Sequence, residues 1–445
     1  MEQNDKSFFD KFNDWMKNSI SVKIFSIAFL VLILLIPASM IESLIHERQY
    51  RSADAITEVS SIWGEAQTLS GPIISIPYNK KYINEKKEIY EKREYAHFLP
   101  EALNINCIVE PEKRHRGIYE VVVYTTSLKF NGNFKDFDFS EWKIADKDIL
   151  WDEATISIGI TDMRGIKEAI KLKWDEKDYS FNPGLETNDV LQTGVSTRIN
   201  ITKDSVNNNF SFSIRLRGSQ YLYFTPVGKI TKVEMKANWE HPSFQGAFLP
   251  EDYKLDENNK SFTAHWQVLN LNRTYPQKWT ESVYNINRSN FGVDLIVPVD
   301  HYKKSERSAK YAIMIIAFTF LIFFFVEVLA KKRIHPIQYL LAGLALIIFY
   351  ALLLAFSEHF GFNTAYIVSS IATISLVTLY SKSIYQNLRE TAITGLSLVI
   401  LYGFVYVTLQ LQDYALLMGS IGLFVVMAIV MYLTRKIDWY RMNDK

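Results

Sequence analysis

The sequence has almost no cysteine and lacks the short motifs that accompany common enzyme chemistry. Its single thiol, Cys107, excludes an intramolecular disulfide and any zinc or iron–sulfur site built from several cysteines. No HExxH, GxSxG, GxGxxG or P-loop pattern occurs in the 445 residues, and the eight histidines are scattered. We therefore expect no catalytic residue, no metal site and no cofactor.

The sequence also has no excess of positive or negative charge, since its formal net charge is only +1. This balance gives no indication of nucleic-acid binding. The mean hydropathy of −0.02 is typical of a soluble protein, but this average hides an uneven distribution. The apolar residues are concentrated at 24–41 and across most of 311–433, with a long polar region between them.

The apolar segments are long enough to cross a membrane. A transmembrane helix needs about 20 predominantly apolar residues. Buried helices of soluble proteins rarely occur as five long apolar runs within so short a stretch, so we predict transmembrane helices. The six segments are 22–41, 311–330, 336–356, 364–380, 392–411 and 414–433.

The short connections between these segments indicate their orientation, because Lys and Arg are enriched on the cytoplasmic side. Basic residues occur in the N-terminal tail, in the KKR stretch at 331–333, after the fourth span at Lys382 and Arg389, and in the C-terminal tail. The alternate connections, SEHFGFN and QD, contain neither Lys nor Arg. We therefore expect both termini in the cytoplasm and the polar region outside.

The first apolar segment has two interpretations, a cleaved signal peptide or an uncleaved signal-anchor. Its apolar stretch is longer than the core of a signal peptide and no clear cleavage site follows, so we favour the signal-anchor. The helical spacing of Ala53, Ile56, Val59 and Trp63 predicts that this helix continues beyond the membrane and ends near Gly64.

The polar region has the patterns of β-strands. Apolar and polar residues alternate in NFSFSIRLRG, KVEMKANW and SFTAHWQV, as in strands with one packed and one solvated face. In a fourth such stretch, Asn131-Gly132 resembles a hairpin turn. We predict an antiparallel β-rich domain, for which two sandwich-like lobes are one arrangement.

Several longer strings resemble the CreD family of bacterial inner-membrane proteins, known as cell envelope integrity proteins. The resemblance is strongest from FGVDLIVPVDHY (291–302) through IHPIQYLLAGLALIIFYALLLAFSEHFGFNTAY (334–366) to TRKIDWY (434–440), and it includes SGPIISIPY and HPSFQGAFLP nearer the N-terminus. It implies a bacterial inner membrane, a periplasmic external domain, and a link to envelope stress and cell-wall antibiotics. It implies no reaction, ligand or catalytic residue.

Polar residues near the span ends are the candidate functional residues. Glu358 and His359 end the third span, and Gln410 and Asp413 fall at the same level between the fifth and sixth. They are either solvated helix ends or a shared cluster that serves as a docking surface or proton-linked site. We expect Glu358 to find a partner in His359 or in a basic group of the external domain.

One carboxylate lies inside a span. Glu327 precedes the KKR stretch by about one turn, and we expect it to snorkel or to pair with Lys331. We interpret Gly395 in the fifth span as a helix-packing position, because small residues let membrane helices approach closely.

Together these patterns predict a cytoplasmic tail at 1–21, a signal-anchor at 22–45, a periplasmic β-rich domain at 46–309, a five-helix membrane region at 310–433 and a cytoplasmic tail at 434–445. We expect a non-enzymatic protein that contacts the lipid bilayer and supports envelope integrity or the stress response by binding an envelope component or a partner protein. A transporter or lipid-handling protein is the alternative, and a membrane-anchored hydrolase is least favoured.

Overall fold

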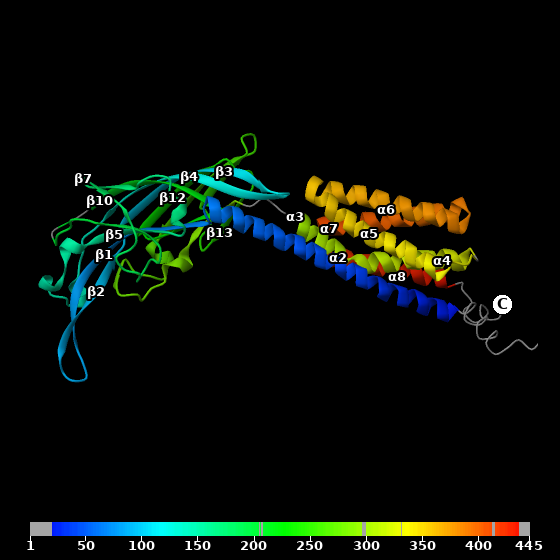
Figure 1. The fold of residues 1–445 in the computed structure, drawn as a ribbon, viewed down its shortest axis with the longest axis horizontal. Coiled ribbons are helices and arrows are strands. Elements are labelled where there is room, and N and C mark those ends of the chain that lie inside the picture. Colours follow the sequence, from blue (N-terminus) through cyan, green and yellow to red (C-terminus); the bar gives the residue numbers. More distant parts are fainter. Residues whose placement is uncertain are drawn as a thin grey trace, which may run out of the picture. The chain divides into compact units, whose positions relative to one another are not determined.

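The chain forms two compact units, a helical unit and a β unit (Figure 1). The computed structural model describes residues 20–203, 205, 208–295, 300–330, 332–411 and 414–435. The helical unit is built from Met1–Arg51 and Val299–Lys445, and the β unit from Ser52–Pro298. A β-rich insertion therefore separates the first long helix from the others.

The six expected apolar helices are confirmed within the described residues. Each has the length and composition to cross a membrane, and one precedes the β unit while five follow it. They are α2 (Ile20–Trp63), α4 (Ala312–Leu329), α5 (Pro336–Phe360), α6 (Phe362–Tyr385), α7 (Leu388–Gln410) and α8 (Ala415–Thr434).

Helix α2 continues well beyond its apolar segment, as the sequence predicts. It ends at Trp63, and Gly64 follows with φ +145°, where a Cβ would lie 2.9 Å from the carbonyl oxygen of Arg217. The guanidinium groups of Arg114 and Arg217 each lie 4.1 Å from the centre of the Trp63 ring. Such cation–π contacts fix the end of α2 within the β unit.

A short helix, α3 (Asp300–Lys310), lies in the region that we expected to be β-rich. It packs against α4, α5, α6 and α7 of the helical unit. Tyr302, Ser305 and Ser308 recur at three-residue spacing and are buried, so one side of this highly charged helix faces the bundle. The small serine side chains provide little hydrophobic signal, which is why this helix was missed.

The β unit contains two mixed sheets. The nine-stranded sheet has the order β13-β17-β11-β1-β5-β9-β8, with β2 beside β1 and β16 beside β2. Its strands are β1 (Gln67–Ile83), β2 (Ile89–Phe98), β5 (Thr155–Ile160), β8 (Asn182–Pro183), β9 (Gly194–Arg198), β11 (Tyr221–Thr225), β13 (Pro242–Gly246), β16 (Lys278–Thr280) and β17 (Phe291–Leu295).

The eight-stranded sheet has the order β14-β15-β12-β3-β4-β10-β6-β7. Most pairs in both sheets are antiparallel, as expected, but β1 pairs with β11 and β3 with β12 in parallel, so the sheets are mixed. The strands of the eight-stranded sheet are β3 (Ala102–Arg116), β4 (Tyr119–Phe134), β6 (Lys171–Trp174), β7 (Lys177–Ser180), β10 (Asn208–Ser219), β12 (Ile230–Ala237), β14 (Asp252–Asp256) and β15 (Ser261–Leu269).

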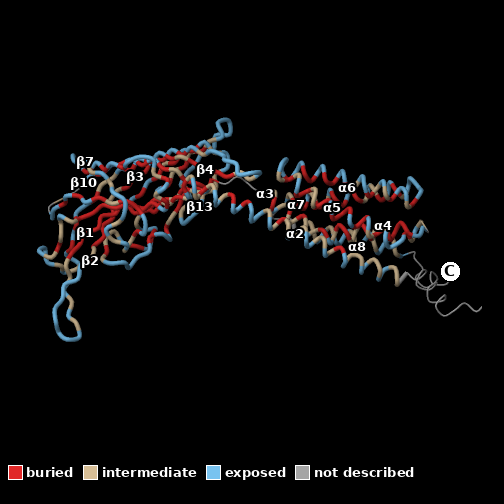
Figure 2. The backbone as a smooth tube through the Cα atoms, in the orientation of Figure 1, coloured by how far each residue is buried: buried red, intermediate tan, exposed pale blue. Residues whose placement is uncertain are grey.

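One hydrophobic core joins the two sheets. It combines Ile74, Ile158 and Phe224 of the nine-stranded sheet with Ile214 and Met235 of the eight-stranded sheet. The buried residues form a continuous layer along the strands of the β unit in Figure 2. Burial of one face of the eight-stranded sheet explains the alternating sequence pattern of β10, β12 and β15, whereas every residue of β5 in the nine-stranded sheet is buried.

The prediction of a hairpin turn at Asn131-Gly132 is wrong. Both residues lie inside β4 and pair with β3 on one side and β10 on the other. The turn between β3 and β4 is at Gly117, with φ +61°. The strand requires glycine at position 132, because a Cβ there would lie 2.0 Å from the carbonyl oxygen of Ala102 on the neighbouring strand.

Candidate functional site

The predicted residue Glu358 contacts two other helices of the helical unit. Its Oε1 accepts a hydrogen bond from the Tyr302 hydroxyl of α3 at 3.0 Å, and Arg48 Nε of α2 lies 3.9 Å from the same oxygen. The Glu358 side chain is only 8% exposed. This carboxylate therefore joins α2, α3 and α5, which the sequence alone could not reveal because α3 was not expected.

The predicted residue Gln410 also contacts α3. Lys304 Nζ donates to Gln410 Oε1 at 3.4 Å, and Gln410 Nε2 donates to Asn363 Oδ1 at 2.6 Å. Helix α3 thus reaches both Glu358 and Gln410 through side chains two positions apart. We call Tyr302, Lys304, Glu358, Asn363 and Gln410 the α3 cluster.

The other two predicted residues are placed differently. His359 is exposed, and its ring centre lies 6.3 Å from that of Phe360. Asp413 lies outside the described residues. The hydrogen bonds and ion pairs of the described part of the chain therefore link Glu358 and Gln410 to α3 and not to His359.

A second group beside α3 has the residue types of a metal site. The ligand atoms of Glu42 and His46 on α2 and Glu306 on α3 lie within 4.8 Å of one another. Lys310 Nζ, however, lies 2.7 Å from Glu306 Oε1, and this hydrogen bond lowers the pKa of Glu306 below its usual range. The ammonium group already supplies positive charge where a cation would bind.

The expected partner of Glu327 lies outside the described residues, but the structure shows other partners. The Glu327 carboxylate forms an ion pair with Lys23 of α2 and accepts hydrogen bonds from the Ile334 amide at 2.7 Å and the Tyr339 hydroxyl at 3.0 Å. Glu327 is 3% exposed. It therefore ties α2, α4 and the start of α5 together, and we call these four residues the Glu327 node.

The bundle contains several buried hydroxyl groups, and Tyr350, Ser369 and Tyr402 carry three of them. Tyr350 of α5, Ser369 of α6 and Tyr402 of α7 each place a buried hydroxyl without a hydrogen-bond partner among the described residues. The Phe349 ring packs edge-on against Tyr350 and Tyr402, with ring centres 4.9 Å apart in both pairs. Since buried polar atoms are usually hydrogen-bonded, these groups give the apolar bundle a local capacity for polar contacts.

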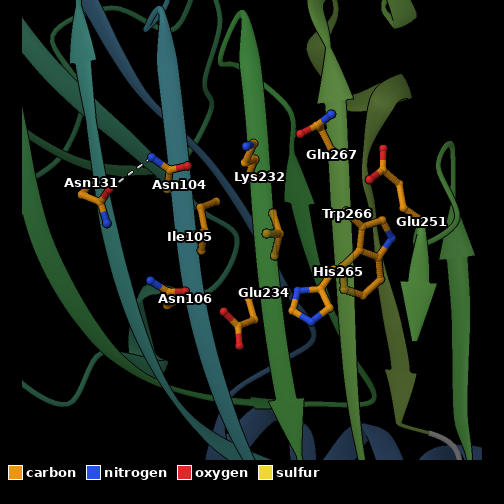
Figure 3. A pocket seen from close by; sticks show the side chains of 11 residues that line it. Asn104, Ile105, Asn106, Asn131, Lys232, Glu234, Glu251, His265, Trp266 and Gln267 are labelled. Carbon is orange, nitrogen blue, oxygen red and sulfur yellow. Dashed lines mark hydrogen bonds between the residues drawn. The ribbon is translucent and has the colours of Figure 1, made fainter. Parts of the chain in front are cut away.

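The β unit carries a polar hollow of about 400 Å³ on the eight-stranded sheet (Figure 3). Two rows of side chains cross the strands there. The strand register aligns Asn131, Asn104, Lys232 and Gln267 in one row, and Asn106, Glu234 and His265 in the other. Glu251 borders the hollow. Because this face is solvated, its residues alternate with the buried core positions of the same strands.

A serine and a histidine of the nine-stranded sheet contact an aspartate that lies between β8 and β9. Ser75 Oγ lies 2.9 Å from His97 Nδ1, and His97 Nε2 lies 3.4 Å from Asp189 Oδ2. The His97 contact lowers the pKa of Asp189. Ser75 is only 4% exposed, so its hydroxyl is covered against a substrate. This arrangement has the residue types of a catalytic triad but fastens the segment around Asp189 to the sheet.

Comparison with known proteins assigns residues 19–440 to a single protein family. A family model described as "Inner membrane protein CreD" matches residues 19–440. Inner membrane protein CreD of Escherichia coli (strain K12) is 34% identical over 438 residues, which cover 96% of this chain and 95% of that protein. Neither description names an enzymatic reaction.

Proposed function

Because the chain belongs to the CreD family of inner membrane proteins, we propose that it is a non-enzymatic binding protein that supports the integrity of the bacterial cell envelope. In this proposal, the apolar helices lie in the inner membrane with both termini in the cytoplasm. The β unit is then in the periplasm, where it binds an envelope component or a partner protein.

The distribution of cations supports this orientation. Cations cluster at the start of α2, between α4 and α5, between α6 and α7, and at the end of α8, positions that successive spans bring to the same membrane surface. An excess of Lys and Arg in such short connections is typical of the cytoplasmic side. The residues are Lys23, Lys332, Arg333, Lys382, Arg389 and Arg435.

Helix α3 also carries cations, although it precedes α4 and so lies at the ends of the spans opposite to these basic connections. It follows a long inserted region, and long segments are translocated largely regardless of their charge. In addition, Lys310 pairs with Glu306 and Lys304 contacts Gln410. These cations therefore have structural roles at that end and carry less weight for orientation.

The observation that carries the proposed binding function is the contrast between the two units. In the helical unit, the buried carboxylates of Glu327 and Glu358 are both engaged by neighbouring helices. In the β unit, the hollow on the eight-stranded sheet presents polar side chains to solvent. Because neighbouring helices already bind both carboxylates, these groups favour a structural role for the helices. The polar face of the β unit is open to solvent, which favours ligand binding there.

One observation favours transport or lipid handling as the second candidate. The buried hydroxyls of Tyr350, Ser369 and Tyr402 provide polar contacts within the bundle. If they contact a transported group, replacing Tyr350 and Tyr402 together by Phe should abolish function while leaving the protein folded. Under the binding proposal this double variant should retain function, because it does not alter the β unit.

The orientation can be tested with reporters. Alkaline phosphatase inserted at Gly117, in the exposed turn between β3 and β4, is expected to be active, because this enzyme needs the oxidising periplasm. Green fluorescent protein at the C-terminus is expected to fluoresce in the cytoplasm. An inactive phosphatase insertion in a folded, membrane-inserted chain would overturn the proposed topology.

The role in the envelope can be tested by deletion and complementation. A strain without the gene should leak a periplasmic enzyme into the medium, and the full chain should stop the leakage. A chain without Ser52–Pro298, verified to insert into the membrane, should fail to restore integrity. Normal integrity in the deletion strain, or full rescue by the shortened chain, would contradict the proposal.

A further inference from the structure

The hollow on the eight-stranded sheet has an extended shape set by the strand register. In its longer row, Asn131 of β4, Asn104 of β3, Lys232 of β12 and Gln267 of β15 lie on adjacent strands (Figure 3). Neighbouring strands are about 4.8 Å apart, so a row across four strands spans roughly 14 Å. A ligand that uses the whole row must be elongated and cross the strands.

The row can both donate and accept hydrogen bonds. Each amide side chain has an NH2 donor and a carbonyl acceptor. Asn104 Nδ2 donates to Asn131 Oδ1 at 3.2 Å, which orients both amides along the row. Beyond Asn131, the register continues the polar row to Ser211 of β10. Such a surface suits a ligand whose groups also donate and accept.

The charges of the hollow nearly cancel. Lys232 and His265 contribute cationic or titratable nitrogen, while Glu234 and Glu251 contribute carboxylates. Lys236 lies 2.8 Å from Glu234 and lowers the pKa of its carboxyl. A nucleic acid or another polyphosphate would need an excess of cations, which the lining of the hollow does not offer; Lys129, beside Asn106, adds one cation at its edge.

The apolar side chains at the hollow belong to the core. Ile105, Val233 and Trp266 line its floor but are at most 2% exposed. Peptide ligands commonly use apolar pockets or an unpaired strand edge. The longer row lies on the face of the sheet, where β4, β3 and β12 are paired on both sides, while β15 pairs with β14 over residues 261–265. The surface therefore fits a peptide poorly.

From these observations we propose that this face binds a glycan chain made of neutral, hydroxyl-rich sugars, with the chain lying across β4, β3, β12 and β15. Each sugar hydroxyl both donates and accepts a hydrogen bond, which matches the amide row. Lys232 and Glu234 add stronger charge-assisted hydrogen bonds. This inference rests on the proposed function, because it names the ligand class of the proposed binding unit.

The test uses the full chain in lipid nanodiscs with two soluble probes, chitohexaose and maltohexaose. Hydrogen–deuterium exchange should show protection of residues 102–109, 229–237 and 261–269 by at least one probe. Calorimetric titration should show that replacing Asn104 and Asn131 together by Ala weakens binding at least tenfold. Gln267→Ala, at the other end of the row, should also weaken binding and provides a second variant if the first is unstable.

A matched control lies on the other sheet. Gln245 is an exposed amide of β13, and Gln245→Ala should leave binding unchanged. Failure of both probes to bind up to their solubility limits, protection elsewhere on the chain, or an equal loss in the control would overturn the glycan inference. If the amide variants also restore envelope integrity fully, the glycan inference fails while the proposed binding function remains.

Discussion

Lys23 and Glu327, which are 304 positions apart in the sequence, form an ion pair inside the helical unit. Tyr339 and the Ile334 amide complete the partners of the carboxylate. Polar groups in an apolar bundle are costly unless they are paired, so this node specifies how α2, α4 and α5 pack.

Removing the Glu327 carboxylate should destabilise the helical unit. Glu327→Leu leaves the buried Ile334 amide without its acceptor and the partly exposed Lys23 ammonium without its ion pair, a change that we expect to cost about 1–3 kcal/mol. Glu327→Gln should cost less because its amide oxygen still accepts. The measurement is the thermal midpoint of the detergent-solubilised protein.

The control for this prediction is an exposed ion pair on α2. Arg51 lies 2.6 Å from Glu47 one helical turn away, and both side chains are more than half exposed. Glu47→Gln should change stability by about 0.5 kcal/mol or less. If Glu327→Leu melted at the same temperature as Glu47→Gln, the node would have no stabilising role.

Glu94 should make the β unit sensitive to acid. Its buried carboxylate contacts Tyr78, Tyr82 and Lys80, with Tyr78 and Lys80 both at 3.0 Å. Burial opposes ionisation, but hydrogen bonds from the two tyrosines and the lysine outweigh it and lower the pKa of Glu94 to about 2. Because the folded pKa is below the ordinary value of 4.5, the stabilisation is present above pH 4.5 and is lost as the pH falls towards 2.

Glu94→Gln should therefore flatten this acidic part of the stability curve. Denaturation of the full chain would be followed between pH 7 and 2 by hydrogen exchange of the β1–β2 hairpin. Glu91→Gln provides the control, because Glu91 is exposed and lies 3.7 Å from Lys81. An unchanged pH dependence in Glu94→Gln would show that other carboxyls cause the acid sensitivity.

The contact between Tyr302 and Glu358 should hold α3 against the bundle. Tyr302→Phe removes the hydroxyl that donates to Glu358 but retains the buried ring. Losing such a hydrogen bond to a charged group costs about 1.5–3 kcal/mol. We expect faster amide exchange across Asp300–Lys310. His359→Ala should leave this exchange unchanged because His359 is exposed, and equal exchange in both variants would refute the anchoring role.

Trp63 should fix the end of α2 within the β unit. Trp63→Leu removes the ring that contacts Arg114 and Arg217 and the indole NH that donates to the Tyr124 carbonyl at 3.3 Å. Each cation–π contact contributes about 0.5–2 kcal/mol. We expect several-fold faster amide exchange over residues 52–63. Ile62→Ala is the neighbouring control, since Ile62 is 81% exposed, and a similar increase there would contradict the assignment.

The apolar helices could be predicted because their signal is local. Each has a long uninterrupted run of apolar residues, and the spacing from Ala53 to Trp63 revealed the extension of α2. Helix α3 gave no such signal because its buried side carries Ser305 and Ser308. The parallel pairings of β1 with β11 and β3 with β12 connect distant segments, which local alternation does not identify.

The candidate site was predictable in its residue types but not in its contacts. Glu358 and Gln410 were selected as polar residues at span ends, yet their contacts with Tyr302 and Lys304 depend on the missed helix. The polar hollow could not be predicted because its rows depend on the parallel pairing of β3 with β12, and because Asn131-Gly132 matched a turn motif. The crowding at Gly132, which keeps this pair inside a strand, comes from Ala102 on the neighbouring strand.

The single cysteine simplifies chemical labelling of this protein. Cys107 is 2% exposed within the core of the β unit, and burial raises the pKa of its thiol to about 12. Maleimides react with the thiolate, so the native residue will remain unlabelled while the protein is folded. Cysteines introduced at exposed positions can therefore be tagged selectively in the otherwise unmodified sequence, and delayed labelling of Cys107 will report when the β unit opens.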